Sequence, residues 1–445
     1  MDASLIRLVE NARLPRYTSY PTAPQFSATV GAEAHAAWLR QLPLAEPTSL
    51  YLHVPYCREL CWYCGCTTHA LGRDERAARY AGLLLRELEI VAAHLPGRPT
   101  VSHLHWGGGT PSVLRDDLFR VMARLRERFG FQPDAELAIE LDPREVDRSF
   151  VQELAAEGFT RASLGVQSFD PQVQRAINRE QSVAATRAAA DGLRAAGIAA
   201  VNLDLLYGLP FQTTANAAAT AAEVVRLEPA RVAVFGYAHL PTLRPMQRLI
   251  PDAALPDAAA RWQQSEAIRA VLEDAGFVAI GLDHYARPDD AMAVAARMGR
   301  LRRNFQGYTT DTATTLLGLG ASAISAFADG YVQNEPRLAE WRAAVLADRL
   351  PTVRGVRLTA EDRARRAVIE TIMCRGEVDL DELLDEPELV RPDMRRLDEL
   401  EALGVIERAG RRIALRPDCR PLLRLLAAAF DAYLDRKVGR HAPAV

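Results

Sequence analysis

The central part of the chain alternates short apolar runs with segments of helical periodicity. Six apolar runs are predicted strands: residues 49–54, 101–106, 136–141, 161–166, 200–206 and 231–237. Five segments between them have the apolar spacing of helices: residues 75–95, 112–129, 144–157, 182–196 and 214–227. The strands are nearly continuous apolar runs, which is typical of parallel strands buried on both faces. Repeated βα units of this kind predict an α/β fold with a parallel sheet, open or closed into a barrel.

Two flanking regions lack this alternation. Residues 14–26 contain three prolines and no helical period, and after about residue 352 the pattern becomes helical and charged, with a short strand pair near its end. We therefore predict a partial or open β/α (TIM-like) barrel at residues 48–350, between an N-terminal arm at 1–47 and a small, mostly helical, winged-helix-like domain at 351–445.

Polar or glycine-rich segments follow every predicted strand of the barrel. They are residues 56–66, 107–110, 142, 167–168, 208 and 238–239. In a β/α barrel these positions meet at the C-terminal mouth, where active sites form. We therefore expect the functional residues among them.

Composition and charge then exclude several classes of function. The net charge is −3, from 54 basic and 57 acidic side chains, and acidic residues equal or exceed basic ones along 379–401, so we expect no nucleic acid partner. The basic residues include a single lysine, Lys437, which excludes a Walker phosphate loop and leaves no other residue for Schiff-base chemistry. No apolar tract is long enough for a membrane span or a secretory signal, and we expect a cytoplasmic protein.

Four of the six cysteines lie within ten residues, between positions 57 and 66. Cys57, Cys61 and Cys64 form a CxxxCxxC loop directly after the first predicted strand. Three thiolates in a tight loop suit a [4Fe–4S] cluster whose fourth iron is open to a small molecule. The alternatives are a zinc knuckle completed by Cys66 or His69, and buried or redox thiols. Neither alternative explains the position at the end of a strand.

The CxxxCxxC loop, with an aromatic residue before its third cysteine, resembles the signature of the radical S-adenosylmethionine (SAM) superfamily. Further blocks resemble the oxygen-independent coproporphyrinogen III dehydrogenases of anaerobic haem biosynthesis: PRYTSYPTA (15–23), YLHVPYCRELCWYCGC (51–66), HWGGGTP (105–111), IELDPRE (139–145), LGVQS (164–168), NREQ (178–181), LDLLYGLP (203–210), YAHLP (237–241), GLDHYARPDD (281–290) and RNFQGYTT (303–310). The fourth cysteine, the arm and the last block make the resemblance specific to this family.

The resemblance implies a radical decarboxylation. A reduced cluster gives one electron to SAM, which splits into methionine and a 5′-deoxyadenosyl radical, and the radical removes a hydrogen from the β-carbon of a substrate propionate. Loss of carbon dioxide and one electron leaves a vinyl group, and two rounds convert coproporphyrinogen III to protoporphyrinogen IX, with two SAM molecules beside one cluster. The implied partners are a reductant protein such as a flavodoxin or ferredoxin and an electron acceptor of unknown identity, and we expect a monomer.

The resemblance also implies roles for individual residues. The expected cluster ligands are Cys57, Cys61 and Cys64, and Tyr63 is expected against an adenine ring. The first SAM molecule is expected to contact Tyr51, Gly108, Glu140 and Ile324. The second is expected to contact Gly109, Thr110, Gln167, Arg179, Asp204 and Ala238. Simpler roles stay open, because Glu140 could cap a helix and Arg179 could pair with Glu180.

Two residues near the cysteines are candidate catalytic groups. Cys66 is not an expected ligand, and a packed thiol is its alternative role. His53 lies two residues after Tyr51, so both side chains point to one face of the predicted strand. It either tunes electron transfer or is a hydrogen-bonded core histidine. The four propionates of the substrate require cations, and the candidates are Arg13, Arg16, Arg302 and Arg303.

Two related functions compete with this interpretation. A haem chaperone of the same superfamily transfers haem without decarboxylation, but such relatives generally lack the PRYTSYPTA arm and the fourth cysteine. A haem-opening radical methyltransferase is the other alternative, and it would consume haem rather than a porphyrinogen.

Overall fold

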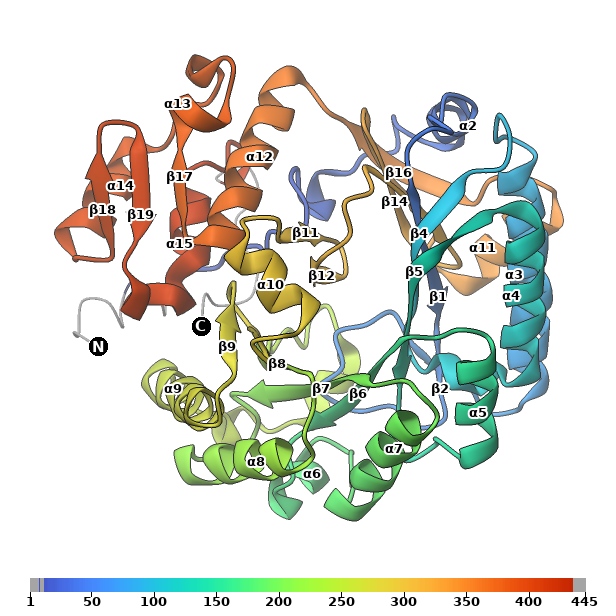
Figure 1. Cartoon of the computed structure of the whole chain (residues 1–445), viewed down its shortest axis with the longest axis horizontal. Coiled ribbons are helices and arrows are strands. Elements are labelled where there is room, and N and C mark those ends of the chain that lie inside the picture. Colours follow the sequence, from blue (N-terminus) through green and yellow to red (C-terminus); the bar gives the residue numbers. More distant parts are fainter. Residues whose placement is uncertain (1–7, 9–11, 435–445) are drawn as a thin grey trace.

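The chain folds around one large twisted sheet (Figure 1), in a computed structural model that describes residue 8 and residues 12–434. The twelve strands lie in the order β16-β15-β14-β13-β1-β4-β5-β6-β7-β8-β10-β9. The strands from β13 to β8 in this order are mutually parallel, and the strands at both ends are antiparallel. Because β16 and β9 stand at opposite ends of the order, the barrel is open, and the predicted partial β/α barrel is confirmed.

The parallel strands are β1 (Thr48–Val54), β4 (Thr100–Gly108), β5 (Gly130–Leu141), β6 (Arg161–Gln167), β7 (Ala200–Tyr207), β8 (Arg231–Gly236) and β13 (Thr315–Leu319). The antiparallel strands are β9 (Val278–Ile280), β10 (His284–Ala286), β14 (Ile324–Phe327), β15 (Gly330–Asn334) and β16 (Thr352–Arg357). The helices of this region are α3 (Glu75–Ala92), α4 (Asp116–Arg128), α5 (Arg148–Ala156), α6 (Pro171–Ala176), α7 (Val183–Ala195), α8 (Thr214–Arg226), α9 (Ala258–Asp274), α10 (Ala291–Arg297) and α11 (Leu338–Leu346).

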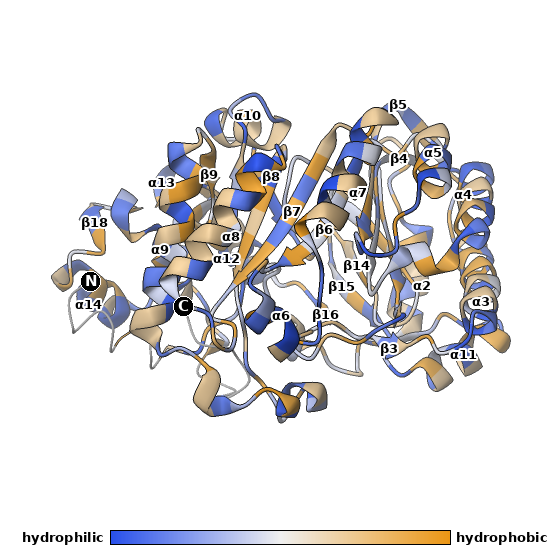
Figure 2. Ribbon diagram, turned by 90° about the horizontal axis from the view of Figure 1, so that it is seen from below, coloured by the Kyte–Doolittle hydropathy of each residue, from blue (hydrophilic) through white to orange (hydrophobic). Residues whose placement is uncertain are grey.

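The helices cover the convex face of the sheet, and their polar sides point outward. Figure 2 shows the outer turns of α3 and α4 mostly in hydrophilic blue, whereas β7 and β8 are largely orange. Four of the five predicted helices are present as continuous helices, namely α3, α5, α7 and α8. The predicted helix at 112–129 divides at Arg115, whose φ of 51° lies in the left-handed region, into a 3₁₀ turn (Pro111–Leu114) and α4.

The prediction that the strands are buried on both faces is wrong for β6 and β7. In both strands buried residues alternate with half-buried ones. The buried residues are apolar and pack under the helices, while Ser163, Gln167, Asn202 and Asp204 face the inside of the barrel. The reason is that an open barrel has a polar interior surface, so its strands need an apolar face on one side only.

The C-terminal region contains a second apolar core that also includes the arm. Its elements are α12 (Ala360–Arg375), β17 (Glu377–Asp379), α13 (Leu380–Leu383), α14 (Met394–Ala402), β18 (Ile406–Ala409), β19 (Arg412–Leu415) and α15 (Leu423–Ala428), with the three strands in the order β17-β19-β18. Leu14, Tyr17 and Tyr20 of the arm are buried in this core, against residues such as Ile369 and Phe430. The arm is therefore fixed to the C-terminal region.

The remaining part of the predicted arm contains a helix that we did not expect. Helix α2 (Ala32–Arg40) packs beside β16, and Ser27 pairs with Gly355 of the same strand. No helix in the described residues is both long and apolar enough to cross a membrane. Lys437 lies outside the described residues. The three-part division at residues 47/48 and 350/351 stays a prediction.

Candidate active site

The cysteine loop lies at the carboxyl end of β1 and is fixed at several points. Short strands β2 (Tyr56–Cys57) and β3 (His69–Ala70) pair in parallel and close the loop. The backbone N–H of Trp62 donates to the carbonyl of Ile177 at 2.9 Å, and the Asn178 amide donates to the carbonyl of Leu60 at 3.0 Å. The loop is therefore anchored both to β1 and to the segment after α6.

The three thiols of this loop lie close to one another. Burial, with the nearby Cys64 and Cys61, raises the pKa of Cys57 to about 12. Among the described residues no three His, Cys, Asp or Glu side chains converge on the position of a single ion. A cubane cluster takes each thiolate on a separate iron, which three cysteines of one tight loop can supply. The residues present therefore fit a [4Fe–4S] cluster.

The positively charged side chain of Arg179 lies beside the loop, where it would stabilise an anionic cluster. The Nη1 atom of Arg179 lies 3.5 Å from Cys61 Sγ and 3.1 Å from Asp142 Oδ2. Its Nη2 atom donates to the carbonyl of Gly165 at 2.8 Å. Arg179 is buried and pairs with Asp142 instead of Glu180.

A cavity of about 610 Å³ opens next to the cysteine loop. It brings together all four residues predicted for the first SAM molecule and both predicted catalytic residues, namely Tyr51, His53, Cys66, Gly108, Glu140 and Ile324. The arm, from Pro15 to Ser19, forms another part of its wall. Cys66 is exposed and lines this cavity.

Tyr51 and His53 form a hydrogen-bonded pair on β1. The Nε2 atom of His53 lies 3.1 Å from the carbonyl oxygen of Thr67, and Nδ1 lies 3.1 Å from Tyr51 Oη. Because a carbonyl only accepts, Nε2 carries the proton and Nδ1 accepts from the tyrosine hydroxyl. Burial lowers the pKa of His53, so this neutral form persists at neutral pH.

Glu140 at the end of β5 holds the glycine segment that follows β4. Its two oxygens accept from the Gly108 N–H and from His105 Nε2, both at 3.0 Å. Burial acts to raise the pKa of Glu140, but these hydrogen bonds outweigh it and lower the pKa. Gly108 has a φ of 110°, and a β-carbon there would lie 2.5 Å from His53 Cε1. This close approach requires glycine.

The residues predicted for the second SAM molecule are spread along the edge of β4, β6, β7 and β8. The N–H groups of Gly109 and Thr110 donate to the carbonyls of Val54 and Tyr56, at 2.7 and 2.8 Å. Gln167 ends β6, Asp204 faces the barrel interior from β7, and Ala238 follows β8. The carbonyl of Ala238 and that of Tyr63 both accept from the Gln247 amide, at 3.1 and 2.9 Å. These residues share one rim of the barrel.

The carboxyl group of Asp204, at this rim, has a raised pKa. Its oxygens accept from Ser163 Oγ at 3.1 Å and from Asn202 Nδ2 at 2.7 Å. Burial, together with the negative charge of Glu140, raises the pKa of Asp204 to about 6. The carboxyl therefore changes protonation state just below neutral pH.

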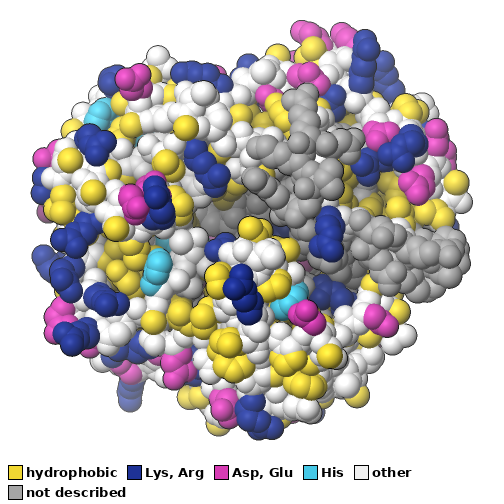
Figure 3. Space-filling model, turned by 180° about the vertical axis from the view of Figure 1, so that it is seen from behind, with side chains coloured by type: hydrophobic (Ala, Val, Ile, Leu, Met, Phe, Trp, Pro, Cys, Tyr) yellow, Lys and Arg dark blue, Asp and Glu magenta, His cyan; other side chains and the backbone are white. Residues whose placement is uncertain are grey.

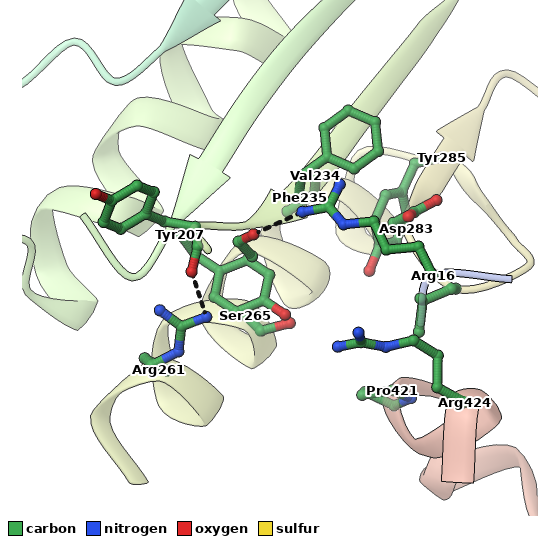
Figure 4. Close-up of a pocket in the computed structure, with 13 residues that line it drawn as sticks. Arg16, Tyr207, Val234, Phe235, Arg261, Ser265, Asp283, Tyr285, Pro421 and Arg424 are labelled. Atoms are coloured by element: carbon green, nitrogen blue, oxygen red, sulfur yellow. Dashed lines mark hydrogen bonds between the residues drawn. The ribbon is translucent and has the colours of Figure 1, made fainter. Parts of the chain in front are cut away.

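A second, smaller cavity of about 40 Å³ lies where the arm, the sheet and the C-terminal region meet (Figure 4). Three arginines from distant segments line it: Arg16, Arg261 and Arg424. Among the described residues that line it, Asp283 is the only acidic one, and this aspartate pairs with His284 at 2.7 Å. Arg16 lines both cavities, so it stands between them.

Of the four arginines predicted to contact the substrate, only Arg16 lines the two cavities described above. Arg302 pairs with Glu370 at 2.7 Å. Arg303 lies over the Tyr308 ring at 4.2 Å and donates to the carbonyls of Arg16 and Tyr17, which fixes the arm. Arg13 is exposed and lines neither cavity. Sequence reasoning missed Arg261 and Arg424, because nothing distinguishes them among so many arginines.

The chain is similar to known proteins over nearly all of its length. The family model of the Radical SAM superfamily matches residues 51–224 of the chain. The chain is 49% identical over 450 residues to an oxygen-independent coproporphyrinogen III oxidase of Bradyrhizobium diazoefficiens, with 100% of both chains covered. It is 41% identical over 429 residues to the oxygen-independent coproporphyrinogen III oxidase of Escherichia coli, which covers 95% of this chain and 93% of that protein.

A solved structure agrees with this similarity. Coproporphyrinogen III oxidase from Escherichia coli, described as a radical SAM enzyme, matches with a TM-score of 0.90 at 40% identity. The match covers 97% of this chain and 99% of that chain. The similarity therefore extends from the arm through the sheet to the C-terminal region, well beyond the cysteine loop.

Proposed function

This chain belongs to the oxygen-independent coproporphyrinogen III oxidases of the radical SAM superfamily, and from that premise we propose the reaction that its site performs. The reaction is the oxidative decarboxylation of two propionate side chains of coproporphyrinogen III to vinyl groups, which gives protoporphyrinogen IX. One observation carries the proposal: the cysteine loop, the Glu140–Gly108 contact and the arm line or border the same 610 Å³ cavity.

We assign the cluster to the three thiols of the loop, Cys57, Cys61 and Cys64. When bound, a [4Fe–4S] cluster and SAM supply the reducing electron and the radical chemistry of the reaction. The protein holds the three thiols near one another on an anchored loop, and Arg179 places its positive charge 3.5 Å from one of them. Cys66, whose N–H donates to Cys64 Sγ at 3.4 Å, stays exposed to the cavity and is proposed to act there as a catalytic residue and not as a ligand.

We place the first SAM molecule in the large cavity, against Tyr51, Gly108, Glu140 and Ile324. The fixed carboxylate of Glu140 is an acceptor for ribose hydroxyls, and the carbonyl edge of the glycine segment accepts from an ammonium group. His53 acts as a positioning residue, because its neutral ring orients the Tyr51 hydroxyl at 3.1 Å. Polar groups fixed in this way need no rearrangement when a ligand binds.

We place a second SAM molecule along the rim formed by Gly109, Thr110, Gln167, Arg179, Asp204 and Ala238, with Tyr63 packed nearby. Two features support this placement. Asp204 offers a carboxylate with acceptor capacity toward the barrel interior, and Arg179 is a buried cation at the same rim. A ribose diol and a SAM carboxylate are the groups that such residues bind.

We propose that the arginine cavity holds a carboxylate of the substrate. Arg16, Arg261 and Arg424 bring three positive charges to a cavity that is large enough for a carboxylate group or a few waters. Guanidinium groups bind carboxylates with two parallel hydrogen bonds, which fixes orientation as well as position. Because Arg16 also borders the large cavity, a propionate held here would belong to a ring system that reaches the cysteine loop.

An anaerobic assay tests the proposed function. The reconstituted chain is incubated with coproporphyrinogen III, SAM and dithionite, and the porphyrins are analysed by mass for the loss of two carbon dioxide units and four hydrogens. We expect conversion of two propionates to vinyl groups, with 5′-deoxyadenosine as the co-product. Absence of vinyl product, together with stoichiometric haem binding, would instead identify a haem chaperone.

The proposed setting is the cytoplasm, where thiols remain reduced. The physiological reductant is proposed to be a small electron-carrier protein of the flavodoxin or ferredoxin type. The chain is proposed to act as a monomer, and size-exclusion chromatography with light scattering tests this state.

A further inference from the structure

We infer that the groove between α3 and α11 is the docking surface for the acidic electron-carrier protein that reduces the cluster. This inference rests on the proposed function and specifies where its protein reductant binds. It is carried by the shape and charge of the groove, and by an aromatic contact chain that leads from the groove to the cysteine loop.

The groove is an apolar hollow on the outside of the barrel, close to the cysteine loop. Its volume is about 690 Å³, and its apolar lining includes Leu83, Leu338 and Trp341. On the side that carries α3 and α11, Figure 3 shows apolar surface bordered by basic side chains. A patch that combines an apolar centre with a charged rim has the composition of a protein interface.

The charge of the rim is positive and largely uncompensated. Arg76, Arg79 and Arg342 are exposed, and none of them forms an ion pair with a carboxylate in the described part of the chain. Arg86 is different, because it pairs with Asp348 at 2.8 Å. The whole chain has a net charge of −3, so this rim is a local positive region on an acidic protein. A partner with an acidic surface fits it, whereas a second copy would bring its own arginine rim against this one.

A chain of aromatic rings joins the groove to the cysteine loop. Trp341 stacks on Tyr80 at 4.9 Å between ring centroids, and Tyr80 meets Tyr56 edge-on at 5.7 Å. Tyr56 lines the groove and directly precedes Cys57. The Tyr80 hydroxyl donates to the carbonyl of His53 at 2.6 Å, which ties the chain of rings to β1. The groove lining therefore includes the residue that directly precedes the proposed cluster ligand Cys57.

Gly82 of α3 gives independent support. It lines the groove at an exposed position in the middle of α3, and glycine is unfavourable in the interior of a helix. A β-carbon at this position would meet no atom within 4 Å, so packing inside this chain does not require a glycine. The missing side chain leaves room for a partner surface to approach the helix closely.

The test compares a protein donor with a small chemical donor. Anaerobically reconstituted holoenzyme is mixed with reduced flavodoxin or with dithionite, and the decrease in cluster absorbance gives the reduction rate. Binding of oxidised flavodoxin to the holoenzyme is measured by calorimetry. The variant is Arg76→Glu combined with Arg79→Glu, and the matched control is Arg148→Glu combined with Arg187→Glu, which reverses two exposed arginines on α5 and α7.

We expect the groove variant to slow reduction by flavodoxin and weaken its binding by about tenfold at low salt, because opposite charges steer association and are screened as salt rises. Reduction by dithionite should be unchanged, and so should both rates in the control. A neutral variant, Gly82→Trp, should fill the groove and slow the flavodoxin reaction without changing the dithionite reaction.

Three results would overturn the inference. They are unchanged flavodoxin rates in both groove variants, an equal loss with dithionite, and a dimer of this chain that the groove variants dissociate. Failure of the proposed function gives a different result: a wild-type cluster that flavodoxin reduces normally but that yields no vinyl product. That outcome contradicts the reaction and still supports the docking surface.

Discussion

The two cavities at the carboxyl edge of the sheet are built in opposite ways. The larger one takes its polar groups from the neighbouring strands β1, β4 and β5, and these groups bond one another: Tyr51 to His53, and Glu140 to Gly108 and His105. The strands are hydrogen-bonded in register, so the positions of these side chains are set by the sheet itself.

The smaller cavity depends on segments that meet only through tertiary packing. Arg16 comes from the arm, Arg261 from α9 and Arg424 from α15. The arm is held here by the hydrogen bond from Arg424 to the carbonyl of Leu14, at 3.2 Å, and by its burial in the C-terminal core. The comparison teaches that the strands set the positions of the residues proposed for the cofactors, whereas the docking of remote segments brings together the arginines proposed for the substrate.

The largest effect is expected at the cysteine loop. Cys61→Ala removes a proposed cluster ligand, so the reconstituted protein should lose most of its iron and sulfide and all vinyl-forming activity. Cys419→Ala, which changes a buried thiol of the C-terminal core, should keep both. Iron and sulfide analysis decides between them, and full cluster content in the Cys61 variant would refute the ligand assignment.

The next effect tests the rigidity of the larger cavity. Gly108→Ala would drive a β-carbon to 2.5 Å from His53 Cε1, so the loop or the ring must move. We expect a loss of activity of about 10²-fold, since displacements of the order of 1 Å are that costly in active sites. Gly197→Ala is the matched control, because Gly197 also has a positive φ, of 97°, but a β-carbon there meets no atom within 4 Å. Equal activity losses in both variants would show that backbone strain, and not the contact with His53, is responsible.

A smaller effect is expected in the arginine cavity. Arg261→Gln removes one cation, and KM for the porphyrinogen should rise by about tenfold while the affinity for SAM is unchanged, because a charged hydrogen bond contributes about 1.5–3 kcal/mol. Arg302→Gln, which breaks an ion pair outside this cavity, should leave KM unchanged. If Arg261→Gln lowered kcat without raising KM, the cavity would not be a substrate site.

The smallest effect concerns the charge of Asp204. Because its pKa is raised to about 6, the folded chain holds a proton between about pH 4 and 6 that the unfolded chain has released. Stability should therefore fall as pH rises through this window, by about 1 kcal/mol after allowance for partial exposure, and Asp204→Asn should remove that slope.

Asp283 provides a control of the opposite sign. Burial acts to raise the pKa of Asp283, but His284 and nearby arginines lower it. Its carboxylate thus contributes the same stability throughout pH 4.5–6.5, and Asp283→Asn should be destabilised equally across that range. Thermal unfolding at several pH values distinguishes the two aspartates, and an unchanged slope in Asp204→Asn would contradict the assignment.

Much of the larger cavity could be predicted because its residues lie in short local patterns. The strand predictions placed Tyr51 and His53 on one face of β1, and the segment 107–110 at the end of β4, where the structure has them. Local hydrophobic periodicity sets the strands, and a parallel sheet brings their carboxyl ends to one edge. The roles of these residues toward SAM came from the family resemblance and stay proposals.

The sequence by itself determined the alternation of parallel strands and helices and the position of the cysteine loop, because periodicity and close spacing are local properties of the chain, and its motifs indicated the family; the strand order of the sheet showed that the barrel is open. The sequence mistook the inner face of β6 and β7 for apolar burial, since a run of apolar residues does not show which face meets a cavity. Only the tertiary structure selected Arg261 and Arg424 from so many arginines and placed them beside Arg16, and only it joined Trp341 to Tyr56 through Tyr80. These sets combine residues that lie far apart in the chain, and packing between the arm, the barrel and the C-terminal region decides which of them meet.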